Sequence, residues 1–149
     1  MKKEPKFIYK DGTTICEVTD NMGRIFRGES NCHPDDKDFE SPITGGVIAE
    51  FRAQIAVAKT YRDDLKIKLS ALRQLYSCIK QSNNFNRNSY ETKMLLRQIS
   101  LTTQDLDIAK HQLAVLKLDL YNYISDKDKI HQYLRKYNAE KLDKNKKNL

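Results

Sequence analysis

The chain has 149 residues, a formal net charge of +7, 39% hydrophobic and 32% charged residues, and only five glycines. This length is sufficient for one domain with a buried core, and the lean, charged composition suits long amphipathic helices. No apolar run approaches the roughly 20 residues of a membrane-spanning helix, and none follows the lysines of "MKKEPKFIYK". We therefore expect no membrane span and no signal peptide, and the unpatterned Cys16, Cys32 and Cys78 suit reduced thiols in a cytoplasm.

The positive charge is concentrated after residue 40. Residues 1–40 carry 7 basic and 9 acidic side chains, whereas residues 41–88 carry 8 and 3, and residues 89–149 carry 12 and 8. The second part of the chain therefore carries a positive field, which attracts nucleic acid, anionic membrane or an acidic protein without distinguishing them.

Residues 1–40 have the pattern of a small β-meander. Asp11-Gly12 separates "FIY" from "TTICEVT", which favours a two-residue hairpin turn with positive φ. "TDNMGR" supplies a second turn before "RIFRGES". Pairing Ile8 with Ile15, and Val18 with Ile25, would place apolar side chains opposite one another. We expect three antiparallel strands with a helix covering one face.

The stretch "NCHPDDKDF" gathers Cys32, His33 and three aspartates, which suggests a metal site, a thiol nucleophile or a capped turn. Adjacent Cys and His seldom both reach one ion, and no CxxC or HxxxH pair occurs. Cys16 could approach Cys32 across the meander, but the sequence shows no fourth ligand. "TGG" at 44–46 also lacks the lysine and spacing of a phosphate-binding loop. We expect a corner in which Pro34 and the aspartates form a turn, followed by Ser41-Pro42 starting a helix. The chain is predicted to have no metal, no cofactor and no catalytic residue, and not to be an enzyme.

Beyond Gly46 the chain has neither glycine nor proline, which predicts long helices because these residues destabilise helix interiors by about 1 and 3 kcal/mol. Apolar residues then recur at the a and d positions of two sets of heptads, here called the seam. The first seam runs through Ile48, Phe51, Ile55, Ala58, Arg62, Leu65, Leu69, Leu72, Tyr76 and Ile79, and the second through Leu95, Ile99, Thr102, Leu106, Ala109, Leu113, Leu116, Leu120 and Tyr123, with Ile130, Leu134 and Tyr137 beyond it.

The predicted fold is α+β and predominantly α. A meander and corner over 1–40 precedes a long antiparallel coiled-coil-like hairpin of helices at about 46–81 and 89–124, the second capped by Asn88 with Glu91. Residues 126–142 are expected to form a short C-terminal helix, or a kinked extension of the second helix. Residues 41–142 thus hold the helices, which form one domain with the meander, and 143–149 form a basic tail.

Every e position of the first helix is basic. The e positions of the second helix are Leu96, Thr103, Lys110, Lys117 and Ile124, so an antiparallel hairpin supplies no acidic partners. This basic stripe is either a solvated face or a contact surface for an acidic partner or a phosphate backbone. Its residues are Arg52, Lys59, Lys66, Arg73 and Lys80.

The second helix carries another apolar stripe outside the seam, and a helix with two apolar stripes must bury both. A second protomer, internal burial or a foreign partner could cover it, and we favour a homodimer. Tyrosines interleaved with the C-terminal cations would suit base stacking, although seam packing already explains half of them. The stripe comprises Met94, Leu101, Ile108, Val115 and Leu118, with Tyr121 extending it.

One short pattern resembles small proteins encoded by prophages of Gram-positive bacteria. It consists of Gly28, "CHPDD" at 32–36, Phe39, a glycine at 45 or 46, "IA" at 48–49 and "RA" at 52–53. The resemblance implies a phage accessory gene, a class that often encodes inhibitors of host or defence machinery. We therefore predict a non-enzymatic binding protein that engages a host protein, such as an antiviral-defence effector, in the bacterial cytoplasm. The alternative is a nucleic-acid-binding accessory protein that uses the same basic stripe.

Overall fold

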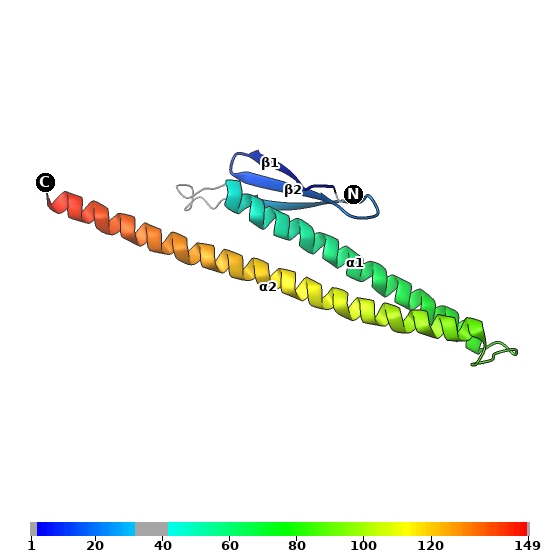
Figure 1. Cartoon of the computed structure of the whole chain (residues 1–149). Helices are drawn as coiled ribbons and strands as arrows, with labels where there is room; N and C mark the ends of the chain where they lie inside the picture. The colour runs from blue at the N-terminus through cyan, green and yellow to red at the C-terminus, as the bar shows by residue number, and fades with distance from the viewer. Residues whose placement is uncertain (1–2, 32–41, 149) are drawn as a thin grey trace. The chain divides into compact units, whose positions relative to one another are not determined.

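The computed structural model describes residues 3–31 and 42–148 of the chain. Three antiparallel strands form a sheet in the order β1-β2-β3, and two helices follow (Figure 1). The predicted α+β class, mostly helical with a three-stranded antiparallel sheet, is confirmed. The predicted corner at Cys32–Phe39 lies outside the described residues. The elements are β1 (Lys6–Lys10), β2 (Thr13–Thr19), β3 (Ile25–Asn31), α1 (Pro42–Lys80) and α2 (Tyr90–Lys147).

The chain divides into two compact units. The sheet unit comprises Met1–Gln54 and Leu116–Leu149, and the helix-pair unit comprises Ile55–Val115. Both helices pass from one unit into the other, so each unit contains a segment of α1 and a segment of α2.

The first hairpin turn of the sheet unit has the geometry that the sequence predicts. Lys10 pairs with Thr13, and the two residues between them have positive φ, 51° at Asp11 and 79° at Gly12. Positive φ at both positions matches the right-handed twist of the flanking strands. The predicted pairing of Ile8 with Ile15 is confirmed.

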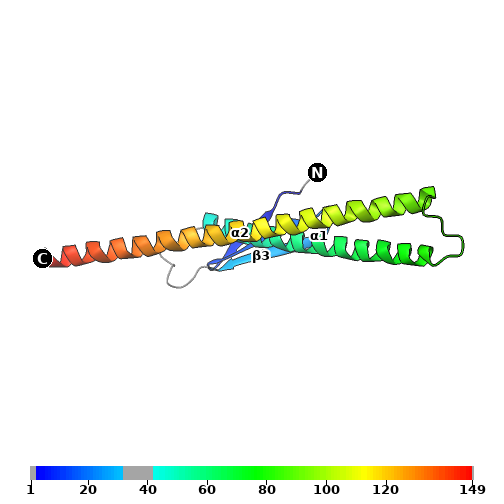
Figure 2. The ribbon, with the colours of Figure 1, turned by 90° about the horizontal axis from the view of Figure 1, so that it is seen from below.

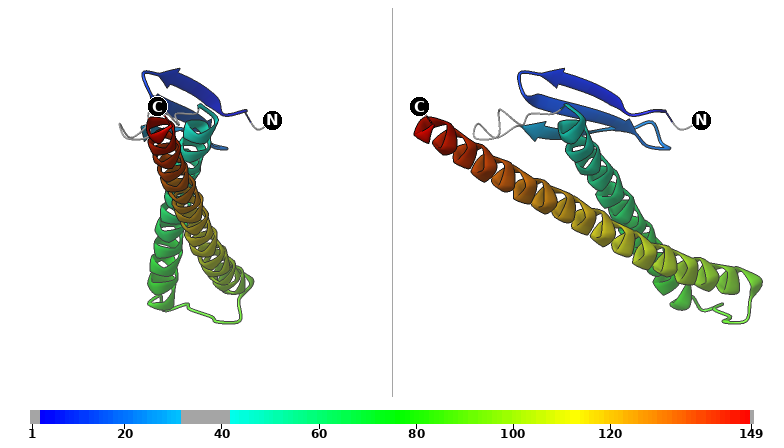
Figure 3. Two further views of the ribbon diagram at one scale, coloured as in Figure 1. Left: turned by 90° about the vertical axis from the view of Figure 1, so that its left-hand side faces the viewer. Right: turned by 60° about the vertical axis from the view of Figure 1, so that its left-hand side comes forward.

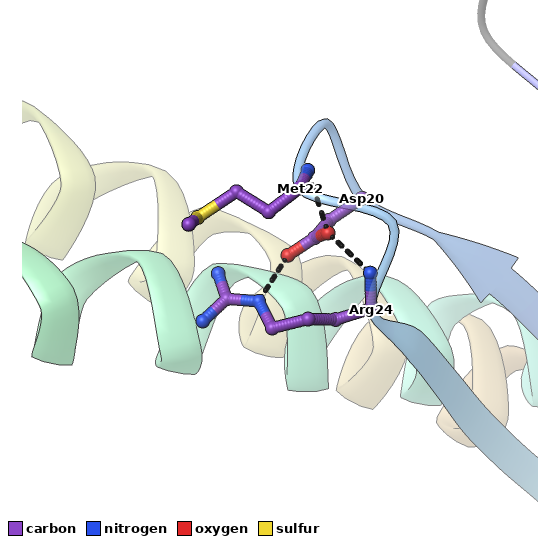
Figure 4. A network of polar contacts seen from close by, with 3 residues as sticks. All are labelled: Asp20, Met22 and Arg24. Atoms are coloured by element: carbon purple, nitrogen blue, oxygen red, sulfur yellow. Dashed lines mark hydrogen bonds and ion pairs between the residues drawn. The ribbon is translucent and has the colours of Figure 1, made fainter.

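The second hairpin turn differs from the prediction, because Val18 pairs with Phe26 rather than with Ile25. The Asp20 carboxylate accepts hydrogen bonds from the backbone N–H groups of Met22 and Arg24, both at 2.9 Å (Figure 4). It also accepts one from Arg24 Nε at 2.7 Å, while Gly23 takes a φ of 81°. These bonds close a three-residue loop, which sets a strand register that apolar pairing alone does not reveal.

The same contacts lower the pKa of the Asp20 carboxyl. Partial desolvation raises its pKa, but the hydrogen bonds from the Arg24 backbone, the Arg24 guanidinium and the Met22 backbone, together with the positive charge of Arg24, outweigh it. The pKa of Asp20 is therefore below its usual value, and the folded turn favours the ionised form.

One face of the sheet packs against the first turns of α1, as Figures 2 and 3 show. Thr14, Cys16 and Val18 on β2 are buried on this face. On β3, a Cβ added at Gly28 would overlap the backbone of Ala49 and Ala53 in α1. A helix can approach a strand so closely only where both surfaces carry small residues. The glycine and the two alanines therefore fix the position of α1 over the sheet.

The segment between the helices ends at a hydrogen-bonded cap. The Ser89 hydroxyl accepts from the Thr92 backbone N–H at 3.2 Å and donates to the Thr92 hydroxyl at 2.8 Å. The prediction of Asn88 as the cap is therefore wrong by one residue. Asn88 instead donates its backbone N–H to the Asn86 side chain at 3.0 Å, in a local turn before the helix.

Instead of the predicted separate C-terminal helix over 126–142, the structure shows α2 continuing through this region to Lys147, and it includes most of the expected basic tail. In the sheet unit the rings of Phe51 and Tyr123 lie 6.3 Å apart, and Lys127 Nζ lies 5.7 Å from the centre of the Tyr123 ring. Lys127 is thus accommodated at a seam position, because its charge lies over the face of the Tyr123 ring. "SDKDK" contains no glycine or proline, so its polarity does not interrupt the helix.

In the helix-pair unit, segments of α1 and α2 lie side by side and run in opposite directions (Figure 1). Leu65, Leu69, Leu106 and Ala109 form a buried cluster, with Ile99 packed against it. Every predicted seam residue of this unit is buried or half-buried, including the two polar ones. Thr102 is 1% exposed, and Arg62 is half-buried with Nε 3.0 Å from Asp63 Oδ1.

Candidate interaction surfaces

The basic stripe of α1 is exposed along its whole length. Four of its five residues lie in the helix-pair unit and are spaced seven residues apart, about 10.5 Å along a helix. Within residues 3–31 and 42–148, none of these four side chains lies within 4 Å of a carboxylate oxygen. We call these four residues the basic row: Lys59, Lys66, Arg73 and Lys80.

The fifth residue of the predicted stripe, Arg52, has a structural role in the sheet unit. Its guanidinium NH1 donates a hydrogen bond to the backbone carbonyl of Glu29 in β3. This bond links α1 to the sheet at the position where the two elements approach most closely. Arg52 is exposed, but its hydrogen bond to β3 also stabilises the packing of α1 on the sheet.

An acidic residue of α1 beside the basic row already has a partner. Asp63 lies one turn from both Lys59 and Lys66 in sequence, but it contacts Arg62, with Arg62 NH2 3.0 Å from Asp63 Oδ1. Asp63 therefore pairs with Arg62 instead of with a residue in the middle of the row. The positive potential of this surface is left uncompensated by its own helix.

The predicted second apolar stripe of α2 is also exposed. In the helix-pair unit its residues are exposed to between 36% at Met94 and 55% at Ile108, with Leu101 and Val115 both at 42%. Leu118, which belongs to the sheet unit, is 57% exposed. Internal burial, one of the alternatives that the sequence left open, is therefore not what the structure shows.

The structure adds two residues that the sequence analysis missed. Tyr61 and Leu75 on α1 are 49% and 51% exposed, and each directly precedes a seam position. The heptad could have identified them. A residue directly before a seam position in sequence lies beside the seam, on the side opposite the e positions. The two antiparallel helices therefore present apolar side chains on a common side. This apolar flank consists of Tyr61, Leu75, Met94, Leu101, Ile108 and Val115.

The basic row and the apolar flank lie on opposite sides of the helix pair. Each residue of the basic row follows a seam position of α1, whereas the flank residues precede seam positions on either helix. In an antiparallel pair, positions that follow the seam on both helices share one side, and positions that precede it share the other. A partner that covers one surface therefore leaves the other free.

Two free cysteines lie among the described residues, the exposed Cys78 on α1 and the buried Cys16 on β2. Burial raises the pKa of the Cys16 thiol, and the negative charges of Glu50 and Glu17 raise it further. This thiol is 0% exposed, so it is a protonated core group rather than a nucleophile. Among the described residues, no three or more His, Cys, Asp or Glu side chains are grouped to hold a metal ion. Cys32 and His33 lie outside that part of the chain.

None of the helices in residues 3–31 and 42–148 is both long enough and apolar enough to cross a bilayer. Comparison with known protein families, with curated proteins and with solved structures finds no match. The basic row and the apolar flank are therefore the features of the described residues that point to a function.

Proposed function

We propose that this chain is a non-enzymatic binding protein whose basic row engages an acidic surface of a partner protein. The observation that carries the proposal is the uncompensated positive charge of Lys59, Lys66, Arg73 and Lys80 along one side of α1. The row extends over 21 residues, about 32 Å on a straight helix. Coiled-coil-like packing of α1 against α2, which is part of this proposal, would hold the four charges in line.

The chemistry of the row favours a regular acidic partner. Exposed ion pairs stabilise a complex by only about 0.2–1 kcal/mol each, so a single contact would not suffice. Four cations on one line raise the association rate and orient the partner, and each pair strengthens when the interface excludes water. A helix carrying acidic residues at seven-residue spacing would match all four positions.

The resemblance of the N-terminal pattern to prophage proteins supplies the biological context of the proposal. It supports a phage-type protein that binds a host protein in the bacterial cytoplasm and inhibits it, an antiviral-defence effector being the leading class. An inhibitor of this kind needs a binding surface and no catalytic group. The surface described above is therefore sufficient for the proposed role.

The test is capture of partners from a bacterial lysate by the full chain and by two matched variants. Lys66→Glu with Arg73→Glu reverses the middle of the basic row, and Lys93→Glu with Lys136→Glu makes the same change in net charge elsewhere. We expect a specific acidic protein to be retained by the wild type and by the control variant, and lost from the row variant. Retention of the same proteins by all three would overturn the proposal.

The second candidate is nucleic-acid binding through the same row, which the same four cations favour. It predicts affinity for duplex DNA or single-stranded RNA that falls steeply between 50 and 200 mM salt. The slope of log affinity against log salt is roughly proportional to the number of phosphates contacted. Fluorescence anisotropy with labelled oligonucleotides measures this directly. If the Lys66→Glu, Arg73→Glu variant binds either nucleic acid as the wild type does, this candidate is excluded.

A further inference from the structure

The apolar flank of the helix-pair unit gathers exposed apolar side chains from two helices. Six large side chains from two helices point to one side, and four of them follow one another at seven-residue intervals on α2. Monomeric proteins rarely expose contiguous apolar patches of more than a few hundred Å², and larger ones mark sites of association. We therefore expect another protein surface to bury the flank.

The spacing of the flank residues makes the surface complementary to itself. When the α2 segment is turned end to end about a point between Gln104 and Asp105, Met94 comes level with Val115 and Leu101 with Ile108. A two-fold symmetric interface needs this property, because each residue of one copy must suit the residue that it meets on the other. Every level of the stripe would bring one apolar side chain against another.

The charges beside the stripe on α2 are compatible with the same arrangement, and the flank side of α1 carries one exposed cation, Lys68, between Tyr61 and Leu75. Under this two-fold rotation Arg97 comes level with Gln112, and Asp105 with Gln104, so no like charges meet beside the stripe on α2. The basic row behaves in the opposite way, because a second copy placed there would bring lysine against lysine. The apolar flank thus suits a second copy of this chain, and the basic row does not.

The size of the flank is sufficient for a stable interface. The stripe from Met94 to Val115 spans about 32 Å, and two helices packed 8–10 Å apart are about 20 Å wide, so each copy would cover roughly 600 Å². Two copies would then bury about 1,200 Å², which is at the lower limit of specific, stable interfaces.

We propose that a second copy of this chain covers the apolar flank, so that two helix pairs form an antiparallel four-helix bundle. The basic rows then face outward on opposite sides of the bundle. The dimer would present two binding surfaces for the partner proposed above, although the dimer itself does not depend on that function.

The mass of the full chain in solution tests the dimer. Light scattering behind size-exclusion chromatography should give twice the 17.4 kDa chain mass for the wild type. Leu101→Lys with Ile108→Lys should give the monomer mass, because it buries four charges in the interface. The control is Ile67→Lys, since Ile67 is 70% exposed on α1 but lies outside the flank. Circular dichroism verifies that each variant is folded.

Cross-linking tests the orientation without weakening the interface. In chains with Cys32 and Cys78 replaced by serine, Met94→Cys and Val115→Cys are made separately and then mixed. Antiparallel pairing predicts a disulfide between the two variants in the mixture and little in either variant alone. A wild type of 17.4 kDa at 100 μM, or a double lysine variant that stays dimeric, would overturn the dimer. Cross-linking of each variant with itself would overturn the antiparallel arrangement.

Discussion

In the sheet unit, α1 lies against β3 so closely that the backbones of Ala49 and Ala53 occupy the space where Gly28 would carry a Cβ. In the helix-pair unit the buried cluster consists of three leucine side chains and one alanine, Leu65, Leu69, Leu106 and Ala109. Leucine rotamers can adjust to a changed neighbour, whereas a backbone in contact with a backbone cannot. The sheet unit should therefore be the less tolerant of added volume, although its buried residues are smaller.

The largest expected effect follows from adding volume at the closest contact. Gly28→Val would force β3 away from α1 and should lower the free energy of unfolding by about 3 kcal/mol or more. The matched change in the helix-pair unit is Ala109→Val, which adds volume at a buried position beside leucine side chains that can adjust, and it should cost about 1–2 kcal/mol. Urea unfolding followed by circular dichroism measures both. Equal losses in the two variants would contradict the contrast between the units.

A pair of neighbouring glycines in the first turns of α1 sharpens the comparison within the sheet unit. A Cβ at Gly45 would lie 2.5 Å from Thr14 Oγ1, which is buried, so Gly45→Ala should destabilise the protein by about 1–2 kcal/mol. A Cβ at Gly46 would lie 3.7 Å from the Phe7 ring, an ordinary contact. Gly46→Ala should stabilise the protein by up to about 1 kcal/mol, because alanine favours the helix. Thermal unfolding should show shifts of opposite sign, and shifts of the same sign would refute this packing.

The smallest effect is expected at the second hairpin turn, which is exposed and held by polar contacts. The folded turn lowers the pKa of Asp20, so its stabilisation is complete well above the usual aspartate pKa of about 3.9 and is lost as pH falls through the lower folded value. Asp20→Asn removes this dependence. The melting temperatures of the wild type and of Asp20→Asn should therefore differ at pH 7 and converge near pH 2. A constant difference across this range would show that the charge of Asp20 does not stabilise the turn.

The features that the sequence predicted correctly are those with a single local cause. Asp11-Gly12 specifies its turn through φ alone, and the heptads locate the buried positions because a helix has one period. The positions of the basic stripe and of the second apolar stripe outside the seam followed from the same period. Local chemistry and periodicity were sufficient for these features.

The features that it predicted incorrectly depend on competition between neighbouring groups. The register of β3 follows the turn that Asp20 closes, through three hydrogen bonds to its carboxylate and one from its backbone N–H to the Arg24 carbonyl at 3.0 Å. Apolar pairing gave the wrong partner for Val18. Ser89 and Asn88 are both good caps, and only the structure shows which one accepts the Thr92 N–H. The contribution of Tyr61 and Leu75 to the apolar flank required both helices to be considered together.

The order of the chain through the two units has a consequence for how the protein reaches its folded state. The helix-pair unit is one continuous segment whose helices are joined by residues 81–89, whereas the sheet unit is divided by the 61 residues from Ile55 to Val115. Closing a 61-residue loop rather than a 9-residue one costs about 1.7 kcal/mol more in chain entropy. Once the helix pair has formed, its antiparallel course brings Ile55 and Val115 to the same end, and that entropy is already lost. Formation of the helix pair therefore lowers the entropy cost of bringing together the two segments of the sheet unit.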